Sequence, residues 1–125
     1  MTTTEKRLST RHPIDIEATV ITPSASIPAR TLDICTGGIR VLSPEPLHPE
    51  TDIAISLATR EETLLSGSTL WAIEVDSKEG SPAFEVGIEV DAFILKEQEA
   101  IGHADREALV REIISRVRKE KAQGS

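Results

Sequence analysis

Apolar and polar residues alternate along most of this chain, which is typical of strands that bury one face. In the run 14–20, aliphatic residues fill every second position, and Asp15, Glu17 and Thr19 fill the positions between them. Five more β-rich segments are bounded by charged, proline or glycine residues: 29–34, 39–42, 53–57, 65–75 and 84–90. Short turns separate these segments and no helical pattern lies between them, so the sequence predicts an antiparallel sandwich or barrel.

The period of the apolar positions changes near the C-terminus. One helical face collects five aliphatic residues: Leu109, Val110, Ile113, Ile114 and Val117. Asp105 is a suitable N-cap for this helix. The pairs Glu107 with Arg111, and Glu112 with Arg116, have the favoured i,i+4 spacing. We expect the helix to cover the β domain; the alternative is contact with a partner, a second copy of the chain included.

Composition narrows the classes of function. The 125 residues suffice for one hydrophobic core, and a formal net charge of −7 disfavours general binding to nucleic acids or anionic membranes. Trp71, Phe84 and Phe93 are the aromatic residues of the chain. They are too few for a surface on which the bases of single-stranded nucleic acid stack, so a small RNA- or ssDNA-binding barrel is a disfavoured alternative.

The sequence also bears on compartment and cofactors. No apolar run is long enough for a secretory signal or a bilayer span, and the single cysteine, Cys35, suits a reducing compartment. We therefore expect a cytoplasmic protein without membrane insertion. Cys35 and the histidines lack paired metal-ligand spacing, and Gly37-Gly38 lacks the Lys-Ser/Thr of a phosphate-binding loop. We expect no metal, no cofactor and no enzyme activity.

Two segments carry candidate binding chemistry. The first, 6–12, is cationic, precedes the first predicted strand and holds Arg7 and Arg11 four residues apart. Guanidinium groups pair with phosphate oxygens through two parallel hydrogen bonds and stack on purine faces, which lysine cannot do. Arginines at this spacing are common in solvated basic segments, so this segment alone identifies no ligand.

The second segment has the sequence Asp-Ile-Cys-Thr-Gly-Gly at the end of a predicted strand. Asp33 and Cys35 are two apart on that strand, so they share one face while the residue between them points into the core. A carboxylate that accepts two parallel N–H bonds matches the edge of guanine. Gly37 and Gly38 allow positive φ and a close approach of the backbone to a ligand. Taken alone, this pattern fits an ordinary hairpin turn.

Together the two segments resemble the PilZ family, bacterial receptors for the second messenger cyclic di-GMP. That family is marked by Arg-x-x-x-Arg, then a strand, then Asp/Asn-x-Ser-x-x-Gly. This chain has Arg7-x-x-x-Arg11 and Asp33-x-Cys35-x-x-Gly38 in that order, with a strand-length segment between them.

The resemblance continues downstream. The segment 67–71 is similar to the Gly-x-Val-x-Trp strand of the family, and 84–90 is similar to its closing Val-Gly-Val-x-Phe strand. The resemblance implies a mainly β protein, a six-stranded antiparallel split barrel followed by a C-terminal helix. The expected division is a flexible tail 1–5, a barrel domain 6–95 with a ligand-binding arm at 6–12, a helical segment 96–121 with a break at Gly102, and a disordered tail 122–125.

The resemblance also implies roles for individual residues. Arg7 and Arg11 would clamp the phosphates and stack on guanine. Asp33 would hold a guanine edge, Gly38 would let the turn close against the ligand, and Cys35 would complete the site. Six further residues are secondary candidates for ligand contact: Lys6, His12, Thr36, Gly37, Arg40 and Trp71.

Two of these secondary candidates, Trp71 and Arg40, have a structural explanation besides ligand contact, and a third, Lys6, bears on the ligand stoichiometry. Trp71 is better explained by packing on the barrel, and Arg40 by exposure on a strand. Lys6 takes the position whose residue, in the family, influences whether one ligand or a stacked pair binds, and it leaves the stoichiometry open.

The chain departs from the family motif at Cys35, where the motif has serine. A thiol is larger than a hydroxyl and a weaker hydrogen-bonding group. Losing one modest hydrogen bond costs about 0.5–1.5 kcal/mol, at most roughly tenfold in affinity. A desolvated arginine–phosphate pair is worth roughly 2–5 kcal/mol. We therefore expect the affinity for cyclic di-GMP to be reduced rather than abolished.

The primary hypothesis is a stand-alone cyclic di-GMP receptor. The ligand would order the arm 6–12 against the barrel near Asp33, and the signal would pass to an unidentified effector protein. The alternative is a degenerate domain that binds no nucleotide and serves as a protein-interaction module. The intact motif residues oppose that alternative, whereas Cys35 favours it.

Overall fold

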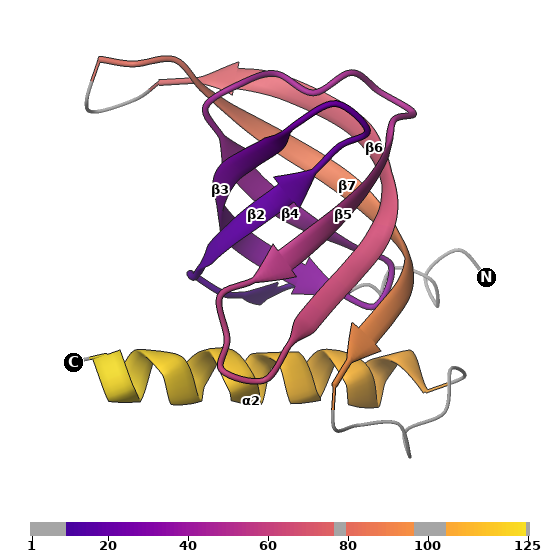
Figure 1. The fold of residues 1–125 in the computed structure, drawn as a ribbon, viewed down its shortest axis with the longest axis vertical. Coiled ribbons are helices and arrows are strands. Elements are labelled where there is room, and N and C mark those ends of the chain that lie inside the picture. Colours follow the sequence, from indigo (N-terminus) through magenta and orange to yellow (C-terminus); the bar gives the residue numbers. More distant parts are fainter. Residues whose placement is uncertain (1–9, 77–79, 97–104, 125) are drawn as a thin grey trace.

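The computed structural model describes residues 10–76, 80–96 and 105–124 of the chain. These residues form seven strands and one helix: β1 (His12–Pro13), β2 (Glu17–Ile21), β3 (Ser26–Cys35), β4 (Gly38–Ser43), β5 (Asp52–Leu57), β6 (Thr63–Val75), β7 (Ala83–Leu95) and α2 (Arg106–Gly124). The helix follows all the strands in the chain, and it lies across one end of the barrel that they form (Figure 1).

The strands form one antiparallel sheet in the order β1-β3-β2-β5-β6-β7-β4, and an additional pairing of β3 with β4 closes it. Strands β2 to β7 therefore make a closed six-stranded barrel. The short β1 is a seventh strand, which pairs with β3 beyond the end of β2. The antiparallel barrel with a C-terminal helix, predicted from the sequence, is confirmed.

The core of the barrel is mainly aliphatic, with Phe93 as an aromatic member. Among its most deeply buried side chains are those of Val20, Ile34, Ile39, Ile55, Leu65 and Val86. They come from β2 to β7, so every strand of the closed barrel contributes to a single core. Burying such a side chain stabilises the fold by about 1.5–3 kcal/mol, which makes this core the main source of stability.

The first predicted strand differs from the structure at its start. Ile14 and Ile16 are buried, as their alternation predicted, but β2 begins only at Glu17. Residues 14–16 still bond to β3, because Ile14 N donates to the Leu32 carbonyl at 3.1 Å and Thr31 N donates to the Ile16 carbonyl at 3.0 Å. The Thr31 hydroxyl adds to these bonds, because it accepts a hydrogen bond from Ile16 N at 2.9 Å and donates to the Ile14 carbonyl at 3.2 Å.

Strand β3 is longer than predicted and begins at Ser26, before Pro28. Pro28 pairs with Thr19 of β2, but β3 pairs with β4 only from Arg30 onward. Proline has no N–H to donate, and it is tolerated where a strand has a neighbour on one side alone. The connection between β2 and β3 is therefore shorter than the gap 21–28 between the predicted segments.

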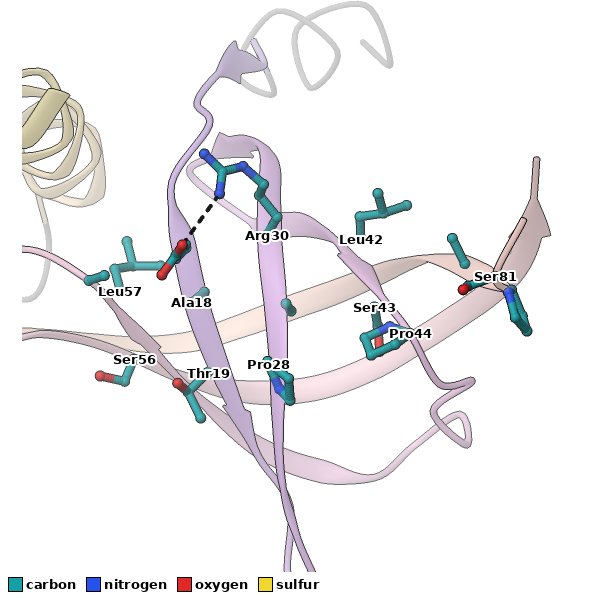
Figure 2. A pocket seen from close by; sticks show the side chains of 15 residues that line it. Ala18, Thr19, Pro28, Arg30, Leu42, Ser43, Pro44, Ser56, Leu57 and Ser81 are labelled. Atoms are coloured by element: carbon teal, nitrogen blue, oxygen red, sulfur yellow. Dashed lines mark ion pairs between the residues drawn. The ribbon is translucent and has the colours of Figure 1, made fainter. Parts of the chain in front are cut away.

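A hollow of about 660 Å³ lies beside this stretch of β3. Figure 2 shows that its wall carries small side chains such as Ala18, Thr19 and Ser56, which leave the space open. Arg30 extends over it toward Glu17, at 3.9 Å between the charged groups. None of the predicted ligand-binding residues that the structure describes lines this hollow, so it is separate from the described part of the candidate site.

Helix α2 packs on the barrel through the apolar face that the sequence predicted. Asp105 caps it, because Ala108 N donates to Asp105 Oδ1 at 3.0 Å. Four residues of this face belong to the same core as the strands: Leu109, Val110, Ile113 and Val117. The helix continues to Gly124, past the predicted end at Lys121, and the turn expected before Gly102 lies mostly outside the described residues. No helix in the described ranges is long and apolar enough to span a membrane.

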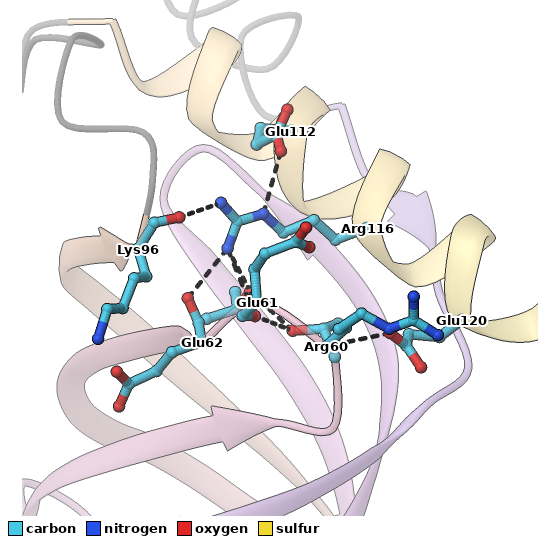
Figure 3. Close-up of polar contacts among 9 residues, drawn as sticks. Arg60, Glu61, Glu62, Lys96, Glu112, Arg116 and Glu120 are labelled. Carbon is cyan, nitrogen blue, oxygen red and sulfur yellow. Dashed lines mark hydrogen bonds and ion pairs between the residues drawn. The ribbon is translucent and has the colours of Figure 1, made fainter.

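Arg116 fastens the helix to the barrel (Figure 3). Its side chain is 2 % exposed, and it donates to the carbonyl oxygens of Glu62 at 2.9 Å and Lys96 at 2.5 Å. Thr63 Oγ1 accepts a further bond at 3.0 Å, and Glu112 accepts one from Arg116 Nε at 3.0 Å. These bonds join α2 to the start of β6 and to the end of β7.

Candidate functional site

One row of paired residues crosses the outer face of the barrel beside the motif turn. In register, Pro13 pairs with Asp33, Asp33 with Arg40, Arg40 with Gly87, and Gly87 with Trp71. Paired residues in antiparallel strands project to the same face of a sheet. The side chains of this row, which we call the Asp33 row, therefore share one face, although they come from β1, β3, β4, β7 and β6.

The Asp33 carboxylate lies between two guanidinium groups. Its side chain is 8 % exposed, and Arg11 Nη1 donates to Asp33 Oδ1 at 3.1 Å. Arg40 donates to Oδ2 from Nε at 2.9 Å and from Nη2 at 2.5 Å. Both oxygens that could accept a guanine edge thus already accept hydrogen bonds from arginine.

Arg40 links Asp33 to Glu85 on β7, because Arg40 Nη1 donates to Glu85 Oε1 at 2.9 Å. The hydrogen bonds to Asp33 raise the pKa of the Arg40 guanidinium above its ordinary value, against the lowering effect of partial burial, and Glu85 adds to the increase. A guanidinium keeps its charge throughout the physiological range. Arg40 is therefore a fixed positive charge between two carboxylates.

Arg11 is held less firmly than Arg40. Its side chain is 53 % exposed, against 31 % for Arg40, and within the described ranges its guanidinium pairs with Asp33 alone. The next residue, His12, is half-buried and pairs in register with Ile34 of β3. The C-terminal end of the predicted arm thus already lies on the barrel. Its Arg11 side chain can turn away at the expense of one hydrogen bond.

The motif turn is shorter and more regular than predicted. Thr36 and Gly37 form a two-residue connection, and Cys35 pairs with Gly38 on either side of it. Neither Gly37 nor Gly38 adopts the positive φ that glycine allows. Instead, a Cβ on Gly38 would lie 2.4 Å from the carbonyl oxygen of Ile88, so the close approach of β7 requires glycine here.

Cys35 is a free cysteine with 7 % exposure. Its thiol is packed at the end of β3 rather than presented to solvent. The difference between cysteine and the serine of the family motif therefore acts on the packing of this strand end as well as on any contact with a ligand.

Trp71 lies over Gly87. A Cβ on Gly87 would lie 2.3 Å from Trp71 Cε2, so the indole ring rests on the bare backbone of β7. The predicted packing of Trp71 on the barrel wall is therefore present. Its remaining exposed surface faces the same side as Asp33 and Arg40.

Arg106, which the sequence did not single out, joins the motif turn to the start of α2. Its guanidinium donates to the carbonyl oxygens of Thr36 at 2.9 Å, Val90 at 3.0 Å and Asp91 at 2.7 Å. It also lies 5.4 Å from the centre of the Phe93 ring. The three carbonyl partners lie 15 to 70 positions away, so no local pattern could reveal them.

The structure brings together part of the predicted site. Arg11, Asp33 and Arg40 are in direct contact. Glu85, which no sequence pattern pointed to, pairs with Arg40. Lys6 and Arg7 lie outside the described residues. Among the residues that the structure describes, no group of three His, Cys, Asp or Glu side chains could hold a metal ion.

A comparison with known protein families gives a match over most of the chain. The profile of the PilZ domain matches residues 5–103. The chain belongs to the PilZ family. The match includes both motif segments and all seven strands, and PilZ domains are binding or receptor modules.

The fold is also similar to a solved structure, that of Bacillus subtilis Inhibitor of motility (MotI/DgrA), with a TM-score of 0.52 and 13 % sequence identity. The match covers 86 % of this chain and 49 % of the other, so this PilZ chain spans about half the length of its structural neighbour. At this identity the similarity supports the fold alone. No curated protein sequence matches this chain.

Proposed function

We propose that this PilZ protein is a receptor for cyclic di-GMP, which binds over the Asp33 row. The observation that carries the proposal is the Asp33 carboxylate, held at the barrel surface by Arg11 at 3.1 Å and by Arg40 at 2.9 Å. The ligand offers two phosphates and two guanine bases. Arginines pair with the phosphates and stack on the guanine bases, and a carboxylate accepts hydrogen bonds from the N–H groups of a guanine edge.

Binding would exchange the partners of Asp33. Guanine supplies two parallel N–H donors to a carboxylate whose oxygens now accept bonds from arginine. Arg11 is the group that leaves, because it is the more exposed and makes one bond to Asp33. Arg40 stays, because Glu85 anchors it, and it keeps the carboxylate oriented. The released Arg11 would clamp the phosphates together with Arg7.

The arm carries the signal in this mechanism. Arg11 and His12 already lie on β3, so the ligand would re-aim Arg11 and fix the remainder of the arm 6–12 against the barrel. An effector protein that contacts the arm, or the barrel face next to it, would sense the difference between the two states.

Calorimetric titration of the folded protein with cyclic di-GMP tests the proposal. We expect saturable heat with the wild type, and a loss of affinity of about thirtyfold or more in Arg11→Ala and in Asp33→Ala, which corresponds to about 2 kcal/mol. The matched control is Arg111→Ala, an exposed helix arginine with one surface ion pair, which should bind as the wild type does. Cyclic di-AMP, which lacks the guanine edge, is the control ligand.

A second function is favoured by one observation. The oxygens of Asp33 are occupied by the protein's own arginines, and Cys35 replaces the motif serine, which together describe a PilZ domain that serves as a protein-interaction module without nucleotide. If neither the wild type nor Cys35→Ser gives heat with high micromolar cyclic di-GMP, while both are folded, this second function replaces the first.

A further inference from the structure

A second concave site lies between α2 and the barrel. It is a groove of about 440 Å³, whose apolar lining comes from Ile14, Leu32 and Leu42 on the barrel side and from Ile114 and Val117 on the helix. Its size lies within the range of about 300–1,000 Å³ that is usual for ligand sites. Leu32, Leu42 and Ile114 are only half-buried, so the groove offers aliphatic surface that a ligand could cover.

The rim of the groove is positively charged. Arg30, Arg118 and Lys121 line it together with one carboxylate, Asp15, which leaves a balance of 3 − 1 = +2. Asp15 already accepts a bond from Arg30 Nε at 2.5 Å and lies 3.9 Å from Lys121 Nζ. Arg118 is exposed and has no ion pair or hydrogen bond from its side chain to the described part of the chain.

This local charge is opposite to that of the whole protein, whose formal net charge is −7. A basic rim around aliphatic surface selects partners that are both acidic and apolar, because like charges placed together at an interface oppose binding. A basic segment would be attracted by the protein at long range and repelled at the groove.

We propose that this groove binds an acidic segment of a partner protein, which places aliphatic side chains between β3 and α2. Those side chains would cover Leu32, Leu42 and Ile114. Carboxylates beside them would pair with Arg118 and Lys121 at the rim. This assigns a location and a chemistry to the effector that the receptor requires.

Pro13 connects the groove to the Asp33 row. It lines the groove and pairs in register with Asp33, two residues after Arg11. A ligand that displaces Arg11 from Asp33 would therefore act on β1, which forms one edge of the groove. This influence of the nucleotide rests on the proposed function, whereas the affinity of the groove for an acidic segment does not.

Fluorescence anisotropy with a labelled peptide tests the groove. The probe is a fluorescein-labelled hexapeptide of alternating leucine and glutamate, and the control probe has lysine in place of each glutamate. We expect saturable binding of the first alone, which weakens as salt is raised. Arg118→Glu should weaken it about tenfold, the effect of reversing one charge of an exposed pair. Lys119→Glu is the matched control, since Lys119 is exposed, adjacent and absent from the groove lining.

Each contrary result overturns the proposal. These results are no saturable binding by the folded protein, equal binding of the lysine peptide, or equal effects of Arg118→Glu and Lys119→Glu. A dimer in light scattering that Arg118→Glu alone dissociates would assign the groove to a second copy instead. If the acidic peptide binds but cyclic di-GMP does not, the groove stands and the proposed receptor function fails; the reverse pattern rejects the groove alone.

Discussion

Arg40 and Arg116 both place a guanidinium in a network, but their partners differ in kind. Arg116 is 2 % exposed and donates mainly to backbone carbonyls and a hydroxyl of the barrel, with one carboxylate from its own helix. Arg40 is 31 % exposed, and the side-chain partners that it binds are the carboxylates of Asp33 and Glu85. Arg116 is fixed by main-chain atoms that cannot move without unfolding a strand end.

This difference separates a structural arginine from a binding one. Backbone acceptors are held in place by the closed barrel, so we expect Arg116 to contribute to stability alone. The carboxylate of Asp33 can exchange an arginine for a ligand donor without moving the backbone. The two networks should therefore respond to mutation in different assays, stability for the first and binding for the second.

The largest expected effect is that of Arg116→Met. Removing the guanidinium leaves the half-buried Glu112 without its partner. It also removes the Arg116 bonds to two backbone carbonyls and to the Thr63 hydroxyl, so we expect the free energy of unfolding to fall by about 3 kcal/mol. Urea denaturation measures it. The control is Arg111→Met, an exposed i,i+4 partner of Glu107, which should change stability by less than about 0.5 kcal/mol. Equal losses in the two variants would contradict the structural role of Arg116.

The next effect concerns two adjacent glycines of the motif turn. A Cβ at Gly38 would overlap the carbonyl oxygen of Ile88, whereas one at Gly37 meets no atom within 4 Å. We expect Gly38→Ala to lower the free energy of unfolding by about 2 kcal/mol and Gly37→Ala to change it by less than about 1 kcal/mol. Thermal denaturation of the pair separates the two positions, and similar values would show that β7 does not fix the turn.

Arg40→Ala should have a mixed effect. It leaves a nearly buried Asp33 with Arg11 as its remaining arginine, so stability should fall by about 1–2 kcal/mol. Affinity for cyclic di-GMP should fall about tenfold, because the carboxylate is no longer held in place. Arg30→Ala is the matched control on β3, since its pairs with Asp15 and Glu17 are exposed on both sides. A loss of stability with unchanged affinity would show that Arg40, like Arg116, stabilises the fold and does not take part in binding.

The smallest effect is expected of Cys35→Ser. The side chain is buried, so a hydroxyl at this position should change stability by at most about 1 kcal/mol. Affinity for cyclic di-GMP should stay equal or rise by up to about tenfold, the value of one modest hydrogen bond. Weaker binding by this variant, measured by calorimetry, would show that the thiol is better suited to this site than the motif serine.

The sequence predicted the fold because its signals are local. Alternating aliphatic residues marked the strands, and the change of period from Leu109 to Val117 marked the helix, which packs as expected. The interruption before Glu17 was not predictable, because the Thr31 hydroxyl takes part in the hydrogen bonds there and threonine is an ordinary strand residue. The same holds for Gly38, whose requirement comes from Ile88 on a distant strand.

The part of the site that lies within one hairpin could be predicted from the sequence. Asp33 and Arg40 face each other across a two-residue turn, so sequence spacing brings them together. Glu85 reaches Arg40 only because β4 pairs with β7 to close the barrel, and Arg106 reaches Thr36 only because α2 begins beside that turn. Contacts between residues so far apart in the sequence form only when the barrel closes. The spacing of residues along the chain therefore does not reveal them.

The position of α2 after all the strands has a consequence during synthesis. The barrel surface that Leu109, Ile113 and Val117 cover becomes protected only when the last part of the described chain has left the ribosome. Until then the nascent barrel exposes aliphatic side chains at one end, the condition in which β proteins aggregate or recruit chaperones. Chains that stall or terminate before residue 105 should therefore accumulate in the insoluble fraction of the cell.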